Sequence, residues 1–171
     1  MSGILLDGDE LSRVKGWGKS GSIIAVGKHR VTQKEVAIKI IQKCGKTPAQ
    51  IEEMRDQIKL YQMAGRCQYV VSMEDYFENR DTFYLCLELL SEQTLYAYIA
   101  SLGYILEERR ARDLIMKIGQ GMQFLHDHGV ILRNFSAMGV LMTNICTDVK
   151  YETSSPRICH LQKAMVMGYD D

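Results

Sequence analysis

Apolar and polar residues in the first quarter of the chain alternate in short blocks. From residue 11 to 41 β-branched residues dominate, and a glycine cluster and the polar stretch HRVTQKE interrupt them. β-branched runs separated by turn-forming residues are typical of strands. We therefore expect a meander of three strands in residues 11–41.

A helical pattern follows in KTPAQIEEMRDQIKLYQMAG. Its apolar residues recur at helical spacing, at Ile51, Met54, Ile58 and Tyr61. Thr47 stands at a capping position and Pro48 lies in the first turn, which are both start signals. This pattern predicts one helix that ends near Gly65.

The rest of the chain begins with strands and continues with helices. YVVSMEDYF and TFYLCLELL flank the turn ENRD and predict an antiparallel pair, so the N-terminal half is β-β-β-α-β-β. TLYAYIASLG predicts a short helix and Leu106–His128 a long one. The apolar face of the long helix carries Leu114, Ile118, Met122 and Leu125. Beyond Gly129 the segments are short, and DVKYETSSP is a candidate surface loop.

Composition narrows the classes of protein. Among 171 residues, 21 Lys and Arg balance 21 Asp and Glu, so a basic nucleic-acid-binding surface is not expected. Five cysteines without a CxxC pair suggest neither a disulfide framework nor a zinc site. No apolar run approaches the roughly 18 residues of a membrane span. We expect no membrane association and a cytoplasmic location, with cytoskeletal and nuclear locations as alternatives.

Two N-terminal motifs gain meaning from their order. GWGKSG matches G-x-G-x-x-G, which by itself fits a hairpin turn equally well. A dinucleotide-binding turn needs a helix directly after the glycines. The segment that follows, SIIAVGKHR, is strand-like, and VAIK comes next.

This order resembles the protein kinases, in which a glycine loop precedes V-A-I-K on the third strand. QIKLYQMAGRCQYVV is similar to the family's helix C and the strand after it, LCLELL to the hinge, and FLHDHGVILRNFSAMGVLM to the catalytic-loop region. The resemblance implies an α+β, protein-kinase-like fold with a five-stranded antiparallel N-lobe sheet, helix C and a partial, mainly helical C-lobe. We expect the N-lobe in residues 1–90 and the hinge with a truncated C-lobe in 91–171.

The resemblance also implies that the catalytic positions are degenerate. Gln57 stands where the family has the glutamate that orients the lysine, and Asn134 replaces the aspartate of H-R-D. Gly139 replaces the metal-binding asparagine, and HLQ, beginning at His160, is the best match to D-F-G. An amide is no base, glycine offers no ligand, and imidazole suits Mg²⁺ poorly. The expected sets of catalytic and metal-ligating residues are therefore empty.

The resemblance leaves a nucleotide site open. Ile23 and Ala37 would form its roof, Leu141 its floor and Leu87 the gatekeeper. The positions that correspond to the family's nucleotide site are Gly16, Gly18, Gly21, Ile23, Ala37, Lys39, Leu87, Glu88, Leu90 and Leu141. We expect that the protein needs no cofactor, and the alternative is that it binds ATP without magnesium.

Three functions follow as expectations. The first is a pseudokinase with a structural or scaffolding role in a larger assembly, whose partner protein covers the face of the long helix formed by Leu114, Ile118, Met122 and Leu125. The second is a nucleotide-binding regulator. The third is an atypical or split serine/threonine kinase.

Overall fold

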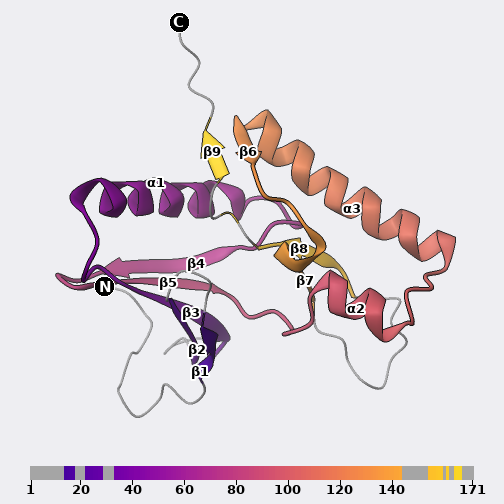
Figure 1. Ribbon diagram of the computed structural model, residues 1–171, viewed down its shortest axis with the longest axis horizontal. Coiled ribbons are helices and arrows are strands. Elements are labelled where there is room, and N and C mark those ends of the chain that lie inside the picture. Colours follow the sequence, from indigo (N-terminus) through magenta and orange to yellow (C-terminus); the bar gives the residue numbers. More distant parts are fainter. Residues whose placement is uncertain are drawn as a thin grey trace, which may run out of the picture. The chain divides into compact units, whose positions relative to one another are not determined.

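The computed structural model describes residues 14–17, 22–28, 33–143, 154–159, 161 and 164–166, with the backbone alone at 14–17 and 164–166. The chain forms two compact units. Unit 1 comprises Met1–Ile58 and Ser72–Leu89, and unit 2 comprises Lys59–Val71 and Leu90–Asp171. Figure 1 labels the helices and strands of both units.

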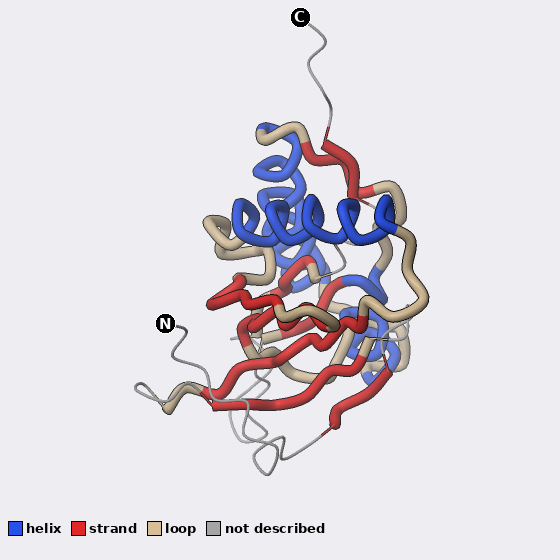
Figure 2. Tube along the Cα trace, turned by 90° about the vertical axis from the view of Figure 1, so that its left-hand side faces the viewer, coloured by secondary structure: helices blue, strands red, loops and turns tan. Residues whose placement is uncertain are grey.

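Unit 1 contains one antiparallel five-stranded sheet, in the spatial order β1-β2-β3-β5-β4 (Figure 2). Its strands are β1 (Val14–Trp17), β2 (Ile23–Lys28), β3 (Glu35–Gln42), β4 (Met73–Glu78) and β5 (Thr82–Glu88). The predicted meander and hairpin are confirmed, and so is the expected α+β architecture with a five-stranded antiparallel sheet.

Strand register gives the sheet two distinct faces. Lys39 lies opposite Ile24 on β2 and Leu85 on β5, and side chains opposite each other in an antiparallel pair share a face. We call this side the lysine face. The other face carries a buried apolar cluster, which consists of Val36, Ile38 and Cys86 with Ile40, Phe77 and Tyr84 packed against it.

Helix α1 (Pro48–Ala64) begins at a capping box. The Gln50 backbone N–H donates to the Thr47 hydroxyl at 3.3 Å, and the Thr47 N–H donates to the Gln50 side-chain oxygen at 2.9 Å. The helix occupies the predicted segment. The division between the two units falls inside it, after Ile58.

Besides the last turns of α1, the described part of unit 2 contains three helices and short paired strands. The helices are α2 (Leu95–Ser101), α3 (Glu108–Asp127) and the short 3₁₀ helix η1 (Ala137–Gly139). β6 (Val130–Leu132) pairs with β9 (Ala164–Val166), and β7 (Val140–Met142) pairs with β8 (Pro156–Ile158), both antiparallel. Thr94 caps α2, since its hydroxyl accepts the Ala97 N–H at 3.0 Å.

Strand β8 also binds the segment that follows α1. The Ile158 N–H donates to the Tyr69 carbonyl at 2.9 Å, and the Val71 N–H donates to the Ile158 carbonyl at 3.0 Å. Ile158 is fully buried. These bonds place residues 59–71 with unit 2, so the observed division differs there from the expected division of the chain at residues 90 and 91.

The prediction for the apolar stripe of α3 is only partly right. Leu114 is 2% exposed and Leu125 is 0% exposed, because α3 packs on β6 and β8 of its own unit. Ile118 and Met122 are half-buried. The expectation that this stripe is left for a partner is therefore wrong for Leu114 and Leu125.

The opposite side of α3 is exposed. Ile115 and Met116 are 69% and 59% exposed, and a Cβ atom added at Gly119 would meet no atom within 4 Å. We call Ile115, Met116 and Gly119 the outer face of α3. Most of the candidate loop DVKYETSSP lies outside the described residues. No helix in the described ranges has the length and apolarity to cross a bilayer.

Candidate functional site

Lys39 is a buried, positively charged residue of unit 1. Its side chain lies on the lysine face of β3 and is 8% exposed. Burial lowers the pKa of Lys39 to about 8, because removal from water penalises the ammonium form. The group is therefore a cation that gives up its proton more readily than an ordinary lysine.

Two apolar residues of the predicted nucleotide site lie beside Lys39. Ala37 is two residues away on β3, so it faces the same side, and Leu87 of β5 lies directly opposite Ala37. Both side chains are half-buried. The structure thus brings Ala37, Lys39 and Leu87 together on one face of one sheet.

Ile23 is not on that face. It lies opposite Ile40, the neighbour of Lys39 in sequence, whereas Ile24 lies opposite Lys39. Successive side chains of a strand point to opposite faces, so Ile24 occupies the side that had been predicted for Ile23. The β2 residues that share this face are Ile24, opposite Lys39, and Val26, opposite Ala37.

The remaining hinge and loop positions are placed in part. The Glu88 N–H donates to the Ser72 carbonyl at 3.0 Å, and the Glu88 carboxylate accepts the Ser72 N–H at 2.9 Å. This carboxylate therefore fixes the chain just before β4. Leu90 is half-buried in unit 2, and Gly16 lies in β1. Gly18 and Gly21 lie outside the described residues.

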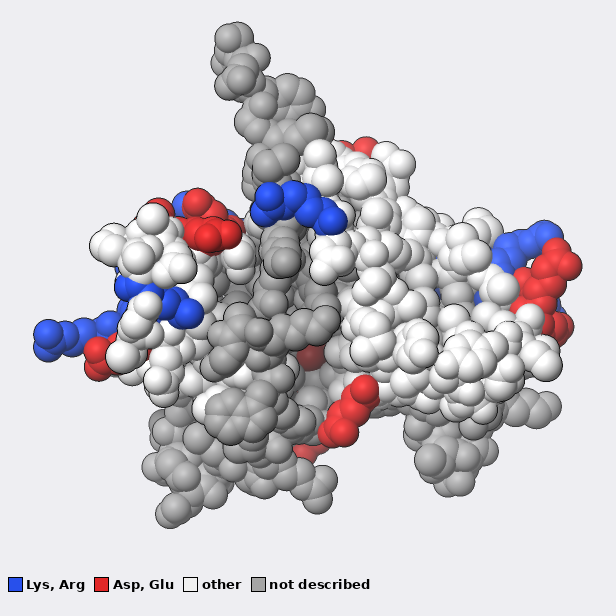
Figure 3. All heavy atoms as spheres, viewed as in Figure 1, with Lys and Arg blue, Asp and Glu red and all other residues white. Residues whose placement is uncertain are grey.

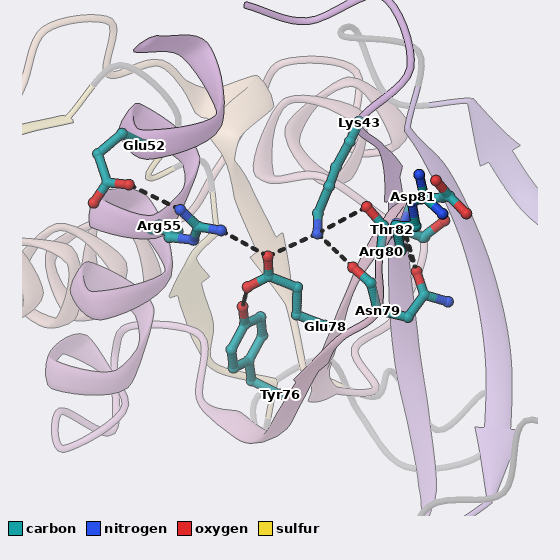
Figure 4. Close-up of polar contacts among 9 residues, drawn as sticks. All are labelled: Lys43, Glu52, Arg55, Tyr76, Glu78, Asn79, Arg80, Asp81 and Thr82. Atoms are coloured by element: carbon teal, nitrogen blue, oxygen red, sulfur yellow. Dashed lines mark hydrogen bonds and ion pairs between the residues drawn. The ribbon is translucent and has the colours of Figure 1, made fainter. Parts of the chain in front are cut away.

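The lysine face also carries a polar network that the sequence analysis missed. Glu78 lies opposite Phe83, which lies opposite Ile41, so Glu78 is on the same face as Lys39. Arg55 of α1 donates to Glu78 at 2.9 Å, and Lys43 donates to it at 2.7 Å (Figure 4).

Glu78 has further contacts that fix its charge. The Tyr76 hydroxyl donates to its second oxygen at 2.6 Å, and Arg55 also pairs with Glu52 at 2.9 Å. The hydrogen bonds from Arg55, Lys43 and Tyr76 lower the pKa of Glu78 to about 2. Gln57, which the resemblance led us to expect as a degenerate position on α1, is half-buried. Its neutral amide offers Lys39 no ion pair.

In unit 2 a backbone hydrogen bond holds one of the positions that were expected to be degenerate. Asn134 is exposed in the turn after β6, and Gly139 is the buried last residue of η1. The Cys159 N–H donates to the Gly139 carbonyl at 2.9 Å. Position 139 is therefore held directly beside the residue that precedes His160.

His160 itself lies outside the described residues, but its flanks are placed. Leu161 is fully buried, and the Tyr61 hydroxyl donates to the Cys159 carbonyl at 3.2 Å. β8 ends at Ile158, and β9, which pairs with β6, begins at Ala164. The HLQ segment thus connects two short strands that both belong to the unit with Asn134 and Gly139.

The chemistry at these positions is limited. The amide of Asn134 has no basicity near neutral pH, and Gly139 has no side-chain oxygen for a metal ion. Leu141 is half-buried on β7 opposite Arg157. Within the described part of the chain, no three His, Cys, Asp or Glu side chains gather as a metal-binding set.

Comparison with known proteins decides the family. A family model described as the protein kinase domain matches residues 10–150. The chain belongs to the protein kinase family. Residues 10–150 include β1 to β5, α1, and the positions of Asn134 and Gly139, so the match covers Lys39 and its sheet as well as these two positions.

Curated members of the family resemble the chain at low identity. MAP kinase-activated protein kinase 2 of Homo sapiens is 28% identical over 138 residues, which are 78% of this chain and 32% of that protein. Serine/threonine-protein kinase SIK2 of Gallus gallus is 23% identical over 133 residues, 78% of this chain and 16% of that protein. Serine/threonine-protein kinase PLK4 of Nematostella vectensis is 27% identical over 133 residues, 74% and 13% respectively. The chain thus spans a third or less of these relatives.

Proposed function

We propose that this chain is a catalytically inactive, protein-kinase-like subunit with a structural role in a larger assembly. The observation that carries the proposal is Gly139, which is joined to Cys159 through its carbonyl and has no side chain at the position where the family has a metal ligand. Asn134 adds to this, because general base catalysis is worth roughly 10²- to 10⁴-fold in rate.

A phosphotransfer assay tests the proposal. The chain is incubated with labelled ATP, magnesium or manganese, and generic protein substrates, beside a Lys39→Ala control. We expect no signal above that of the control. Turnover that disappears in Lys39→Ala would show an active, atypical kinase instead.

The structural role is supported by the surface of unit 2. The exposed large apolar side chains of the described residues all belong to this unit, and they are Tyr96, Tyr104, Ile105, Ile115, Met116, Phe135 and Met138. Uncharged side chains cover most of the surface over α2 and α3 that Figure 3 shows, and charged ones gather where α3 begins. Clustered exposed apolar groups are typical of protein interaction sites.

The partner in this proposal is another protein that covers the outer face of α3. Net charge of zero disfavours nucleic acid as the ligand. A cytoplasmic location, with cytoskeletal and nuclear locations as alternatives, belongs to the same proposal.

A second candidate function is magnesium-independent nucleotide binding. It is favoured by the shared face of Ala37, Lys39 and Leu87 and by the apolar Ile24 beside them. A thermal-shift titration with ATP, with and without magnesium, tests it. A rise in the midpoint that occurs equally in EDTA supports the candidate, and a rise that needs magnesium contradicts it.

A further inference from the structure

Glu78 connects three elements of unit 1. It is the last residue of β4, and one of its oxygens accepts Arg55 of α1 at 2.9 Å and Lys43 after β3 at 2.7 Å. The other oxygen accepts the Tyr76 hydroxyl at 2.6 Å. Both carboxylate oxygens are therefore used by donors that approach from the helix and from the sheet (Figure 4).

Lys43 is held in place independently of Glu78. Its ammonium group also donates to the Asn79 carbonyl and lies 4.6 Å from the centre of the Phe83 ring. Its backbone N–H donates to the Asp81 carbonyl at 2.8 Å. Because Lys43 is already fixed, little further ordering of this side chain is needed when it pairs with Glu78.

The turn after Glu78 is also ordered by local contacts. The Asn79 side-chain oxygen accepts the N–H groups of Asp81 at 2.9 Å and Thr82 at 2.7 Å. Isolated exposed ion pairs contribute little to stability, since ordering two long side chains costs about as much as the pair gains. A carboxylate with three donors on a prearranged turn avoids most of that cost.

We propose that Glu78 is the positioning residue that holds the first part of α1 on the lysine face of the sheet, through Arg55. Gln57 of α1 is neutral and cannot form an ion pair with Lys39, whereas Arg55 brings a positive charge of the same helix to Glu78. The inference goes beyond the proposed function. It assigns the position of the first part of α1 to a contact with the end of β4.

Hydrogen exchange on the full chain tests the proposal. Amides of residues 52–58 report on the first part of α1, and amides of Leu85 and Cys86 on the central strand β5 report on global unfolding. We expect Glu78→Gln to accelerate exchange at 52–58 by about tenfold while the β5 amides change far less. Arg55→Gln should give the same pattern, and the double variant should add little, because both residues act through one contact.

A control variant makes the test specific. Glu74→Gln removes a carboxylate of the same strand that pairs with Lys34 at 2.5 Å, and it should leave exchange in α1 within about twofold. If Glu78→Gln destabilises the whole unit, Arg55→Gln carries the test alone, because it leaves the bonds of Lys43 and Tyr76 to Glu78 in place. Unchanged α1 exchange in Glu78→Gln, additive effects in the double variant, or equal loosening in Glu74→Gln would each overturn the proposal.

Discussion

Gly121 of α3 lies so close to Tyr69 that an added Cβ atom would stand 3.2 Å from both the carbonyl oxygen and the Cβ atom of Tyr69. The same added atom would stand 3.0 Å from the Cδ1 atom of Ile158. The glycine lets α3 approach the junction at which β8 meets the segment after α1. This junction also holds Cys159, and with it the carbonyl of Gly139, in place.

Two glycines of α3 should therefore respond to alanine in opposite ways. Gly121→Ala should destabilise the chain by about 1–3 kcal/mol, because backbone atoms of Tyr69 must move. Gly119→Ala should stabilise it by about 0.5–1 kcal/mol, since its Cβ meets nothing and alanine is the better helix former. Urea unfolding of both variants gives the comparison. If both variants change the free energy of unfolding in the same direction, the close approach of Gly121 to Tyr69 does not determine the effect of alanine at position 121.

Acid should weaken the contribution of Glu78. Its donors lower the pKa to about 2 from an ordinary value of 4.5. A lowered carboxyl pKa stabilises the folded state fully above the unfolded value, and the effect is lost as pH falls through the folded value. Urea midpoints should therefore differ clearly between wild type and Glu78→Gln at pH 7 and converge toward pH 2. A difference that is constant across this range would argue against an ionised Glu78 as the source.

The helices were predictable to within a few residues because their signals are local. Thr47 and Pro48 mark the start of α1, and the apolar period of α3 extends over several turns. The register of β2 on β3 was not predictable from the glycine motif. A slip of one residue moves every side chain to the other face of the sheet, and this is why Ile24 and not Ile23 shares a face with Lys39.

Tertiary partners explain the other errors and omissions. The sequence shows that Leu114 and Leu125 share a stripe, but β6 and β8, which cover it, are short strands without a strong pattern of their own. The network around Glu78 joins residues from positions 43 to 78, and each of them alone is an ordinary surface charge or tyrosine. Only folding brings these residues together.

Lys39 should cost stability at neutral pH. Its pKa falls from 10.5 in the unfolded chain to about 8 in the fold, so folding is opposed by protonation of a buried amine. This cost is complete below pH 8 and disappears as pH rises toward 10.5. Lys39→Met should therefore raise the free energy of unfolding at pH 7 by roughly 1–3 kcal/mol, with a gain that shrinks by pH 10. Wild type and Lys39→Met are compared at pH 7 and at pH 10, so that the titration of the other groups cancels in the difference. An equal gain in the free energy of unfolding at the two pH values would contradict the assigned pKa.

The outer face of α3 should determine whether the chain associates. Burying an apolar side chain of this size is worth roughly 1.5–3 kcal/mol, so Ile115 and Met116 together offer a partner a substantial free energy of binding. In size-exclusion chromatography with light scattering, the mass of the wild-type species should rise with concentration if the chain associates with itself. If the partner is another protein, that protein should elute together with the chain. Ile115→Glu with Met116→Lys should abolish it and reduce the binding of an apolar dye, while the unfolding midpoint stays within the usual range for surface changes.

Leu114→Ala is the matched control for that experiment. It removes a neighbouring apolar side chain that is buried inside unit 2, so it should cost about 2–5 kcal/mol of stability without removing the exposed side chains. If the wild-type chain is a stable monomer with weak dye binding, the proposal of a partner at this face is wrong. Leu114→Ala could alter the association while Ile115→Glu with Met116→Lys leaves it unchanged. In that case the apolar surface comes from the core of a partly unfolded chain and not from the outer face of α3.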